Sequence, residues 1–272
     1  PIRDGATLPF TLLEGNTEFT IDSQVEDTQT DPNAGQTAAS SLVDAGYPAV
    51  TGAAGSEITI QVAENVFIPN NVAACSPAST SPAITDLDDN NLIWRTPPSD
   101  ALQGQVLAQV ATENEGASTA ATMYVNNSYG QALSDSFVSA FSGSVQNQVS
   151  FPKGASSYSS QLSQALSDDP DIVVVVGYPE SGVQLFRDYY SGYDGSTPFL
   201  VTDGLQDSDL PSDVGNAMTN VQGSAPSASG PGRDFFTTEY QNEFDAEPGV
   251  FTSQAFDATA VCLLANAAAG EN

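Results

Sequence analysis

The feature that most constrains the fold is a strand–helix–strand pattern in residues 171–204. Residues 172–176 (IVVVV) form an unbroken β-branched run, which is typical of a parallel strand buried on both faces. Pro179 suits the first turn of the helix that follows, and residues 199–201 form a second short strand. Two strands joined through a helix lie parallel with a right-handed crossover. This segment therefore predicts an α/β fold.

Polar side chains follow both strands at the points where they end. Tyr178 follows the first strand and Asp203 follows the second. Ligands of parallel α/β sheets bind beyond the carboxyl ends of the strands, so these residues are the first candidates for ligand contact. Each also has a structural interpretation. Asp is common before Gly in turns, and a tyrosine at a strand end can be an aromatic at the edge of the core.

The remaining sequence repeats short apolar strands and helical patterns in two halves. Two segments, 95–98 and 220–226, are rich in Pro, Ser or Gly and resemble linkers. We therefore predict two lobes, with residues 1–97 beginning the N-terminal lobe, 98–224 forming the C-terminal lobe and 225–272 returning to the first. The other predicted strands lie at 7–11, 18–25, 49–51, 72–75, 92–95, 121–125 and 145–151, and the clearest other helices lie at 31–42, 58–67 and 101–114.

The charge balance excludes several partners. The chain carries 34 Asp and Glu against 5 Lys and Arg, a net charge of −29, which repels nucleic acid and anionic membrane surfaces. The acids are scattered singly, which argues against a disordered acidic tail. A halophilic source explains them better, because molar salt shortens the Debye length to about 3 Å. No apolar run approaches the roughly 20 residues that span a bilayer, and we expect any signal peptide to lie outside this sequence.

The absence of histidine excludes most familiar catalytic and zinc sites. It removes Ser-His-Asp and Cys-His catalysis together with zinc sites built on His. Cys75 and Cys262 could form one bridge, although two buried thiols are favoured. The acidic loop at 86–90 resembles a calcium loop but has Asn91 and Pro97 where Gly and Glu are required. We expect no enzyme, metal site or cofactor.

Eight segments spread over nearly the whole chain carry a resemblance to a known family. They are VEDTQTDP, VTGAAGSEIT, CSPASTSPAIT, WRTPPSDALQG, MYVNNSYGQAL, VVVVGYPESG, FLVTDGL and AFDATAV. In this order they resemble the type I periplasmic-binding-protein family. Within it, they are most similar to the branched-chain amino acid (Leu/Ile/Val-type) receptors of ABC transporters, and the acidity is similar to that of haloarchaeal members. The resemblance implies a two-lobed Venus-flytrap fold in which each lobe is a parallel sheet flanked by helices.

The resemblance also implies a set of ligand contacts for a free amino acid held between the lobes. Hydroxyl groups and a helix start in the first lobe would hold the ligand α-carboxylate, since a helix N-terminus favours anions. A carboxylate in the second lobe would take the ligand ammonium, with one tyrosine beside it and another lining the mouth of the cleft. The same residues can be structural, as a helix N-cap, loop polar groups or aromatics at the edge of the core. The residues are Ser56 at the helix start, the hydroxyl-bearing Ser79 and Thr80, the carboxylate of Asp203, Tyr178 beside it and Tyr129 at the mouth of the cleft.

Two departures from the family pattern concern length. The predicted strands at 7–11 and 18–25 are separated by only a few residues, too few for the helix that the family has there. The family also continues beyond Asn272, so the sequence is interpreted as truncated and internally shortened.

The resemblance implies a monomeric, extracellular solute-binding protein, tethered to the cell surface through a segment outside this sequence. It would deliver an amino acid-like ligand to the permease of an ABC importer. The alternative with the same fold is the ligand-binding sensor domain of a signalling receptor. A carboxylate-pair hydrolase is the third hypothesis, but no nucleophile motif or acid pair singles it out.

Overall fold

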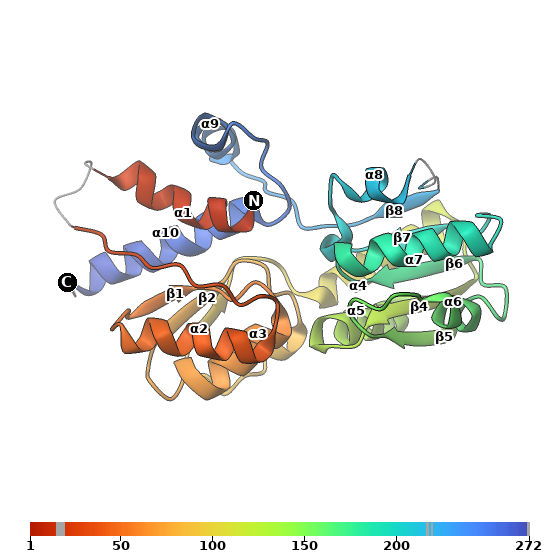
Figure 1. The fold of residues 1–272 in the computed structure, drawn as a ribbon, viewed down its shortest axis with the longest axis horizontal. Helices are drawn as coiled ribbons and strands as arrows, with labels where there is room; N and C mark the ends of the chain where they lie inside the picture. Colours follow the sequence, from red (N-terminus) through yellow and green to blue (C-terminus); the bar gives the residue numbers. More distant parts are fainter. Residues whose placement is uncertain (15–19, 216–217, 219, 271–272) are drawn as a thin grey trace. The chain divides into compact units, whose positions relative to one another are not determined.

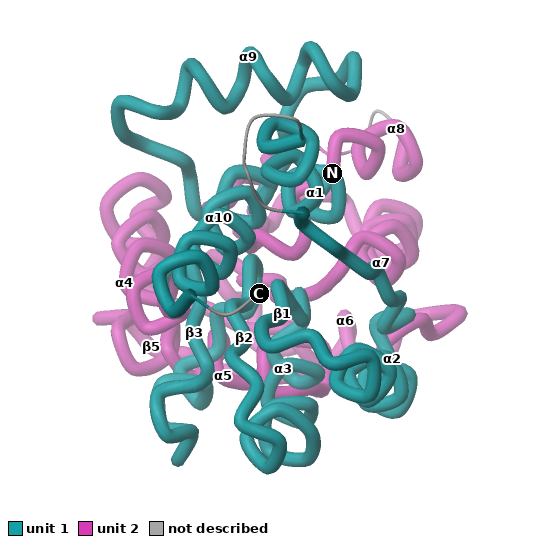
Figure 2. The backbone as a smooth tube through the Cα atoms, turned by 90° about the vertical axis from the view of Figure 1, so that its left-hand side faces the viewer, with its two compact units in different colours: residues 1–98, 226–272 teal, residues 99–225 magenta. Residues whose placement is uncertain are grey.

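The computed structural model describes residues 1–14, 20–215, 218 and 220–270. The chain divides into two compact units, which Figure 2 colours separately. Unit 1 comprises Pro1–Pro98 and Pro226–Asn272, and unit 2 comprises Ser99–Ala225. Each unit contains one parallel sheet with helices packed on it, and Figure 1 labels the helices and strands. Among the described residues, no helix is long and apolar enough to cross a membrane.

Unit 1 has a three-stranded sheet in the order β1-β2-β3. Helices α2 and α3 share a buried cluster with all three strands, whereas α10 contacts β1 and β2 and packs on α1 and α9. The elements are α1 (Ile2–Leu13), α2 (Pro32–Asp44), β1 (Ala49–Thr51), α3 (Ser56–Val62), the π-helical turn η1 (Ala63–Phe67) that continues α3, β2 (Ala73–Ser76), the 3₁₀ turn η2 (Pro82–Ile84), β3 (Ile93–Arg95), α9 (Arg233–Phe244) and α10 (Thr252–Ala269).

Local sequence explains where α2 begins and why it packs closely. The Asp31 carboxylate accepts hydrogen bonds from the backbone N–H groups of Asn33 and Ala34, and Pro32 occupies the first turn. A Cβ atom on Gly35 would lie only 2.5 Å from the Ile58 side chain of α3. The predicted helix at 31–42 is therefore confirmed, and its small residues allow α2 and α3 to approach.

Unit 2 has a five-stranded sheet in the order β5-β4-β6-β7-β8. Because parallel crossovers are right-handed, α5 lies on one face while α6 and α7 lie on the other. The elements are α4 (Asp100–Gln109), its π-helical continuation η3 (Val110–Asn114), β4 (Thr119–Val125), α5 (Ser128–Ala140), β5 (Ser144–Phe151), α6 (Ser159–Ala165), β6 (Ile172–Val176), α7 (Pro179–Gly192), β7 (Phe199–Val201), the 3₁₀ turn η4 (Asp203–Leu205), α8 (Leu210–Val214) and β8 (Val221–Gly223).

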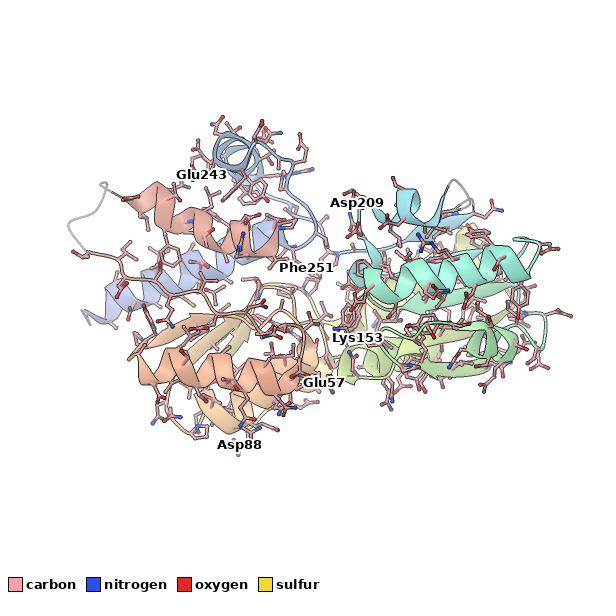
Figure 3. All side chains as sticks on the ribbon, in the orientation of Figure 1. Glu57, Asp88, Lys153, Asp209, Glu243 and Phe251 are labelled. Carbon is pink, nitrogen blue, oxygen red and sulfur yellow. The ribbon has the colours of Figure 1, made fainter. Side chains whose placement is uncertain are left out.

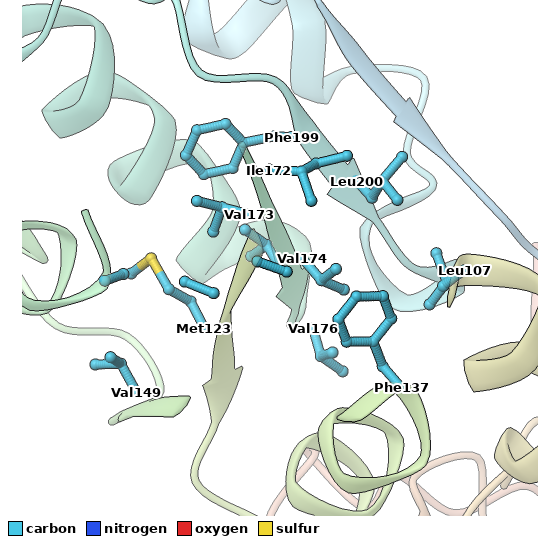
Figure 4. Close-up of a cluster of buried hydrophobic side chains, with 14 of the residues drawn as sticks. Leu107, Met123, Phe137, Val149, Ile172, Val173, Val174, Val176, Phe199 and Leu200 are labelled. Carbon is cyan, nitrogen blue, oxygen red and sulfur yellow. The ribbon is translucent and has the colours of Figure 1, made fainter. Parts of the chain in front are cut away.

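Strand β6 is the centre of the unit 2 core. All five of its residues have no exposed surface, which confirms the prediction of a strand buried on both faces. Figure 4 shows these valines between side chains from neighbouring strands and helices, including Met123, Phe137 and Phe199. The strand-end residues discussed below therefore extend from the least exposed part of the unit.

Gly104 permits the close contact between α4 and α5, and replacing it is expected to destabilise unit 2. A Cβ atom there would lie 2.6 Å from the Ser136 backbone of α5. Gly104→Ala gains about 1 kcal/mol of helix propensity. We expect a net loss of about 2 kcal/mol in the free energy of unfolding, because backbone atoms cannot move aside as a side chain can. Urea titration in high salt measures it. Gly192→Ala in α7, where no atom lies within 4 Å, is the control and should cost nothing.

The predicted strand at 7–11 is wrong. These residues lie inside α1, whose buried Leu8 packs with Phe236 and Tyr240 of α9. The short run TLPFT concealed a longer helical pattern, and Pro9 does not end the helix. Gly5 fixes the packing, because a Cβ there would meet the Thr252 carbonyl of α10. Tertiary packing has overridden the local pattern.

The predicted strand at 18–25 is also not observed. Residues 18 and 19 lie outside the described residues, and residues 20–25 belong to no strand. Alternating polar and apolar residues form a strand only where a neighbouring strand supplies backbone hydrogen bonds, and residues 20–25 join neither of the two described sheets. The Glu26 side chain that follows them accepts a hydrogen bond from Ser41 of α2. Since residues 2–13 are helical, the reason given for an internal shortening no longer holds.

The segment 220–226, interpreted as a linker, contains strand β8. Its residues pair with β7, with Val221 opposite Phe199. Gly223 is needed for this approach, because a Cβ atom there would lie 2.6 Å from the Val201 carbonyl oxygen. The boundary between the two units, at Ala225 and Pro226, falls at the end of the same segment, so the sequence analysis missed a strand at its start.

Candidate ligand-binding residues

The polar cluster of unit 2 lies at the point where the strand order reverses. The chain leaves β4 toward β5 on one side, whereas β6 lies on the other side of β4. In open parallel sheets, ligands bind outside the carboxyl ends of the strands at this switch point. Tyr129 comes after β4, Tyr178 after β6 and Asp203 after β7. The structure therefore brings the three predicted residues of this unit to one edge of the sheet.

The Tyr129 hydroxyl organises this edge. It donates to Asp203 Oδ1 at 3.1 Å and accepts from the backbone N–H of Gly204 at 3.3 Å. It also shares a 2.9 Å hydrogen bond with the Thr202 hydroxyl. With 3% of its surface exposed, Tyr129 holds the turn that carries Asp203.

Tyr178 extends the cluster across the β4–β6 boundary. Its ring stacks on that of Tyr129, with centroids 5.5 Å apart and 24° between the planes. Its hydroxyl accepts a hydrogen bond from Asn127 Nδ2 at 3.3 Å. Asn127 also caps α5 by accepting from the Gly130 N–H at 2.9 Å. The position of Tyr178 is thus set by residues that follow β4.

Asp203 is a buried carboxyl group held by neutral donors. It is 3% exposed, and the side chains that donate to it are those of Gln103 and Tyr129. Burial raises the pKa of Asp203 to about 6, although these hydrogen bonds oppose the rise. The pKa of the Tyr129 hydroxyl lies well above its usual value. Burial is the main cause, and the charges of Asp203 and Asp100 raise this pKa further. Above pH 6 the site therefore holds a buried negative charge.

Gln103 is a member of this cluster that the sequence analysis missed. It lies in α4, is 8% exposed, and donates from Nε2 to the Ser224 carbonyl oxygen at 2.8 Å. Its side chain also hydrogen-bonds Asp203. The available signal was its spacing, since Gln103 shares a helical face with the buried residues Leu107 and Ala111.

The candidate residues of unit 1 follow β1 and β2. Ser79 is fully buried, and its hydroxyl lies 2.8 Å from that of Thr59 and donates to the Ala54 carbonyl at 3.1 Å. The Ser56 hydroxyl accepts from the Ser81 N–H at 3.2 Å. These two hydroxyls therefore hold the loop after β2 against the start of α3.

Thr80 differs from its neighbours. It is 1% exposed, and its hydroxyl has no hydrogen-bond partner within the described part of the chain. Arg95 of β3 fixes the backbone on both sides of it by donating to the Ser81 carbonyl at 2.6 Å and the Ser79 carbonyl at 3.5 Å. Because a buried polar group without a partner costs about 1–3 kcal/mol, the Thr80 hydroxyl is the group in this loop best suited to a ligand.

The two cysteines are free thiols in unit 1. Cys75 is buried, and burial followed by the nearby Cys262 raises its pKa to about 12. Cys262 is half-buried, and burial raises its pKa as well. Within the described ranges, no group of three or more Cys, Asp or Glu side chains could hold a metal ion.

Comparison with known proteins identifies the family. Residues 2–272 match the model of the periplasmic binding protein family. The chain is 27% identical over 252 residues to the chemotactic signal transduction system substrate-binding protein BasB of Halobacterium salinarum, covering 90% of this chain and 59% of that protein. The chain thus spans less than two thirds of the length of this curated relative.

Solved structures show the same fold. A leucine binding protein LivK from Thermotoga maritima superimposes with a TM-score of 0.85 at 25% identity, covering 99% of this chain and 78% of that one. The branched-chain amino acid transporter substrate binding protein LivJ from Streptococcus pneumoniae, in complex with isoleucine, gives a TM-score of 0.86 at 20% identity, with coverages of 100% and 79%. These relatives are binding proteins, and with the match over nearly the whole sequence they show that this chain belongs to the periplasmic binding protein family and has its type I fold.

Proposed function

We propose that this chain captures a small zwitterionic solute, a branched-chain amino acid or a similar compound, for an ABC importer. Unit 1 supplies the group for the solute carboxylate at Thr80, and unit 2 supplies the group for the ammonium at Asp203. The single observation that carries the proposal is the Asp203 carboxylate, which is 3% exposed and held only by neutral side chains. A buried carboxylate of this kind is best compensated by a cation.

The other candidate residues have supporting roles in this proposal. Tyr129 and Gln103 orient Asp203, Tyr178 packs beside them, and Ser56 and Ser79 hold the loop that presents Thr80. The protein acts as a monomer, outside the cell and tethered to its surface, and catalyses no reaction.

Calorimetric titration in molar KCl tests the choice of solute. L-Leucine, L-isoleucine and L-valine form the test panel, and two truncated probes form the control. 4-Methylpentanoate lacks the ammonium of leucine, and 3-methylbutylamine lacks its carboxylate. Binding of at least one amino acid with loss of binding to both truncated probes supports the proposal. Silence toward every amino acid, or equal affinity for 4-methylpentanoate, contradicts it.

Replacing Thr80 by Val is expected to weaken leucine binding about tenfold or more without destabilising the protein. The isosteric change removes a hydroxyl that has no partner among the described residues, so the free protein loses no hydrogen bond. A hydrogen bond to a charged group contributes about 1.5–3 kcal/mol, which sets the expected loss of affinity. Titration calorimetry and urea unfolding measure the two effects.

Ser79→Ala is the informative companion to this variant. The Ser79 hydroxyl bonds to Thr59 and Ala54, so its removal should lower stability. Thr37→Val on the exposed side of α2 should change neither property. If Thr80→Val binds leucine as the wild type does, the role of Thr80 is refuted.

A second function with the same chemistry is solute sensing. The similarity to BasB, a chemotactic signal transduction substrate-binding protein, favours it. Deleting the gene in its host separates the two. Loss of leucine uptake with chemotaxis intact indicates transport, whereas loss of chemotaxis toward leucine with uptake intact indicates sensing.

A further inference from the structure

Gln103 presents an acceptor atom that the fold leaves unused. The side chain is more than nine-tenths buried, and its Oε1 atom has no hydrogen-bond partner among the residues that the structure describes. The other end of the same amide is fully engaged. Nε2 donates to the Ser224 carbonyl oxygen at 2.8 Å, and the side chain also hydrogen-bonds the Asp203 carboxyl.

The orientation of this amide is determined by its partners. The Ser224 carbonyl and the Asp203 carboxylate are both acceptors, so both require the NH₂ end of Gln103. A flipped amide would place Oε1 against two other oxygens and would leave the NH₂ group without its acceptors. The oxygen of Gln103 therefore faces away from Ser224 while remaining within one amide group of Asp203.

The backbone on which Gln103 lies is held firmly. The next residue, Gly104, packs against the α5 backbone, where an added Cβ atom would lie 2.6 Å from Ser136. Ser224 is fixed in turn, because its backbone N–H donates to the Val201 carbonyl oxygen of β7 at 3.1 Å. Both anchors restrict the Gln103 side chain, so the free acceptor has a defined position.

A buried acceptor next to a buried carboxylate matches an ammonium group. A primary ammonium has three N–H bonds, and a single carboxylate oxygen satisfies one of them. Leaving a buried amide oxygen unpaired is costly, and a ligand N–H removes that cost. We propose that Gln103 is a further ligand-binding residue, whose Oε1 accepts a second hydrogen bond from the solute ammonium while its Nε2 positions Asp203.

This inference rests on the proposed function and adds a specificity that Asp203 alone does not give. A lone carboxylate binds any cation of suitable size, including ammonium groups that carry one N–H. The Gln103–Asp203 pair requires at least two N–H bonds on the same nitrogen. The solutes selected are therefore primary and secondary amines, and tertiary amines with a single N–H bond are rejected.

The test compares L-leucine with N,N-dimethyl-L-leucine, which keeps the positive charge but has one N–H. Wild type, Gln103→Met and the control Gln105→Met, on the exposed side of the same helix, are titrated with both probes in molar KCl. Any steric penalty of the methyl groups cancels in the comparison between proteins, as in a double-mutant cycle. We expect Gln103→Met to reduce the preference for leucine about tenfold, and Gln105→Met to leave it unchanged.

Two further measurements separate binding from a merely structural role. Loss of structure in Gln103→Met would lower the affinity for both probes equally and leave the preference intact. Urea unfolding of Gln103→Met beside Gln105→Met measures any loss of structure directly. Carboxyl NMR titration of ligand-free protein should show a higher pKa for Asp203 in Gln103→Met, since the hydrogen bond from Gln103 lowers that pKa.

The possible failures are distinguishable. A wild-type protein silent toward leucine refutes the proposed function and this inference together. A wild type that binds leucine, loses it on Asp203→Asn and keeps its preference in Gln103→Met refutes only the role of Gln103.

Discussion

Asp203→Asn is expected to abolish measurable leucine binding while making the folded protein more stable at neutral pH. Removing one partner of a buried charge pair costs about 2–5 kcal/mol of binding free energy, or roughly 30-fold to several thousand-fold in affinity. The gain in stability comes from the same burial. A buried carboxylate is costly to ionise, as its pKa of about 6 against an ordinary 3.8 shows.

The pH dependence follows from the direction of this shift. In the folded protein Asp203 binds a proton more tightly than in the unfolded chain, because burial raises its pKa. Its contribution to stability is therefore full below the unfolded pKa and is lost as the pH rises through about 6. A shift of about two pKa units corresponds to about 3 kcal/mol. Part of this gain is lost in the Asn variant, because the new NH₂ group faces the Gln103 and Tyr129 side chains, which donate to the carboxylate. A net gain of about 1–2 kcal/mol in the free energy of unfolding is therefore expected above pH 7.

Urea unfolding at several pH values, with wild type and Asp203→Asn in parallel, measures the effect. The difference in the free energy of unfolding should grow between pH 4 and pH 7 and then level off. Asp88→Asn, which removes an exposed carboxylate, is the control and should show no such rise. If Asp203→Asn is less stable than wild type at every pH, the ionised Asp203 carboxylate does not destabilise the folded protein, and the prediction is contradicted.

Lowering the salt concentration is expected to destabilise the whole protein strongly. The net charge is −29, and the three ion pairs found among the described residues all involve partly exposed side chains or the amino terminus. Exposed acids such as Asp88, Asp209 and Glu243 extend from different elements (Figure 3). At 0.1 M salt the Debye length is about 10 Å, so these charges repel one another, whereas molar salt screens them.

Thermal unfolding between 0.1 and 3 M KCl measures this repulsion. A loss of about 5 kcal/mol at low salt would lower Tm by roughly 10–20 °C for a chain of this size. The triple variant Asp88→Asn, Asp209→Asn, Glu243→Gln should have a shallower salt dependence than wild type. Sucrose serves as the control, because it favours burial without screening charge. Equal Tm values at both salt concentrations would show that the acidity has no such cost.

Sequence reasoning located the strand-end residues but not their partners. Asp203 and Tyr178 were found because a β-branched run defines a buried strand, and the carboxyl ends of such strands form one edge. Gln103 lies 100 residues before Asp203, and only the packing of α4 within unit 2 brings the two together. The proposal for Thr80 depends on which hydroxyls of its loop already have hydrogen-bond partners, and no periodicity in the sequence reports that.

The wrong predictions have related causes. Residues 7–11 form part of a helix because Leu8 packs on α9, a contact with a segment more than 200 residues away. Strand β8 was missed within the linker segment because Gly223, which suggested a linker, allows a close approach to β7. In each case local composition was read correctly, and a distant neighbour decided the structure.

Unit 1 consists of two separate stretches of the chain, and this determines the order in which the two units can fold during synthesis. Unit 2 is a single stretch, Ser99–Ala225, so all of its contacts are available once the ribosome has released that stretch. Unit 1 needs α10 against α1 and β1, and α10 is synthesised near the end of the described chain. During synthesis, the early strands β1 and β2 must therefore wait without the cover of α10 until that helix has been made.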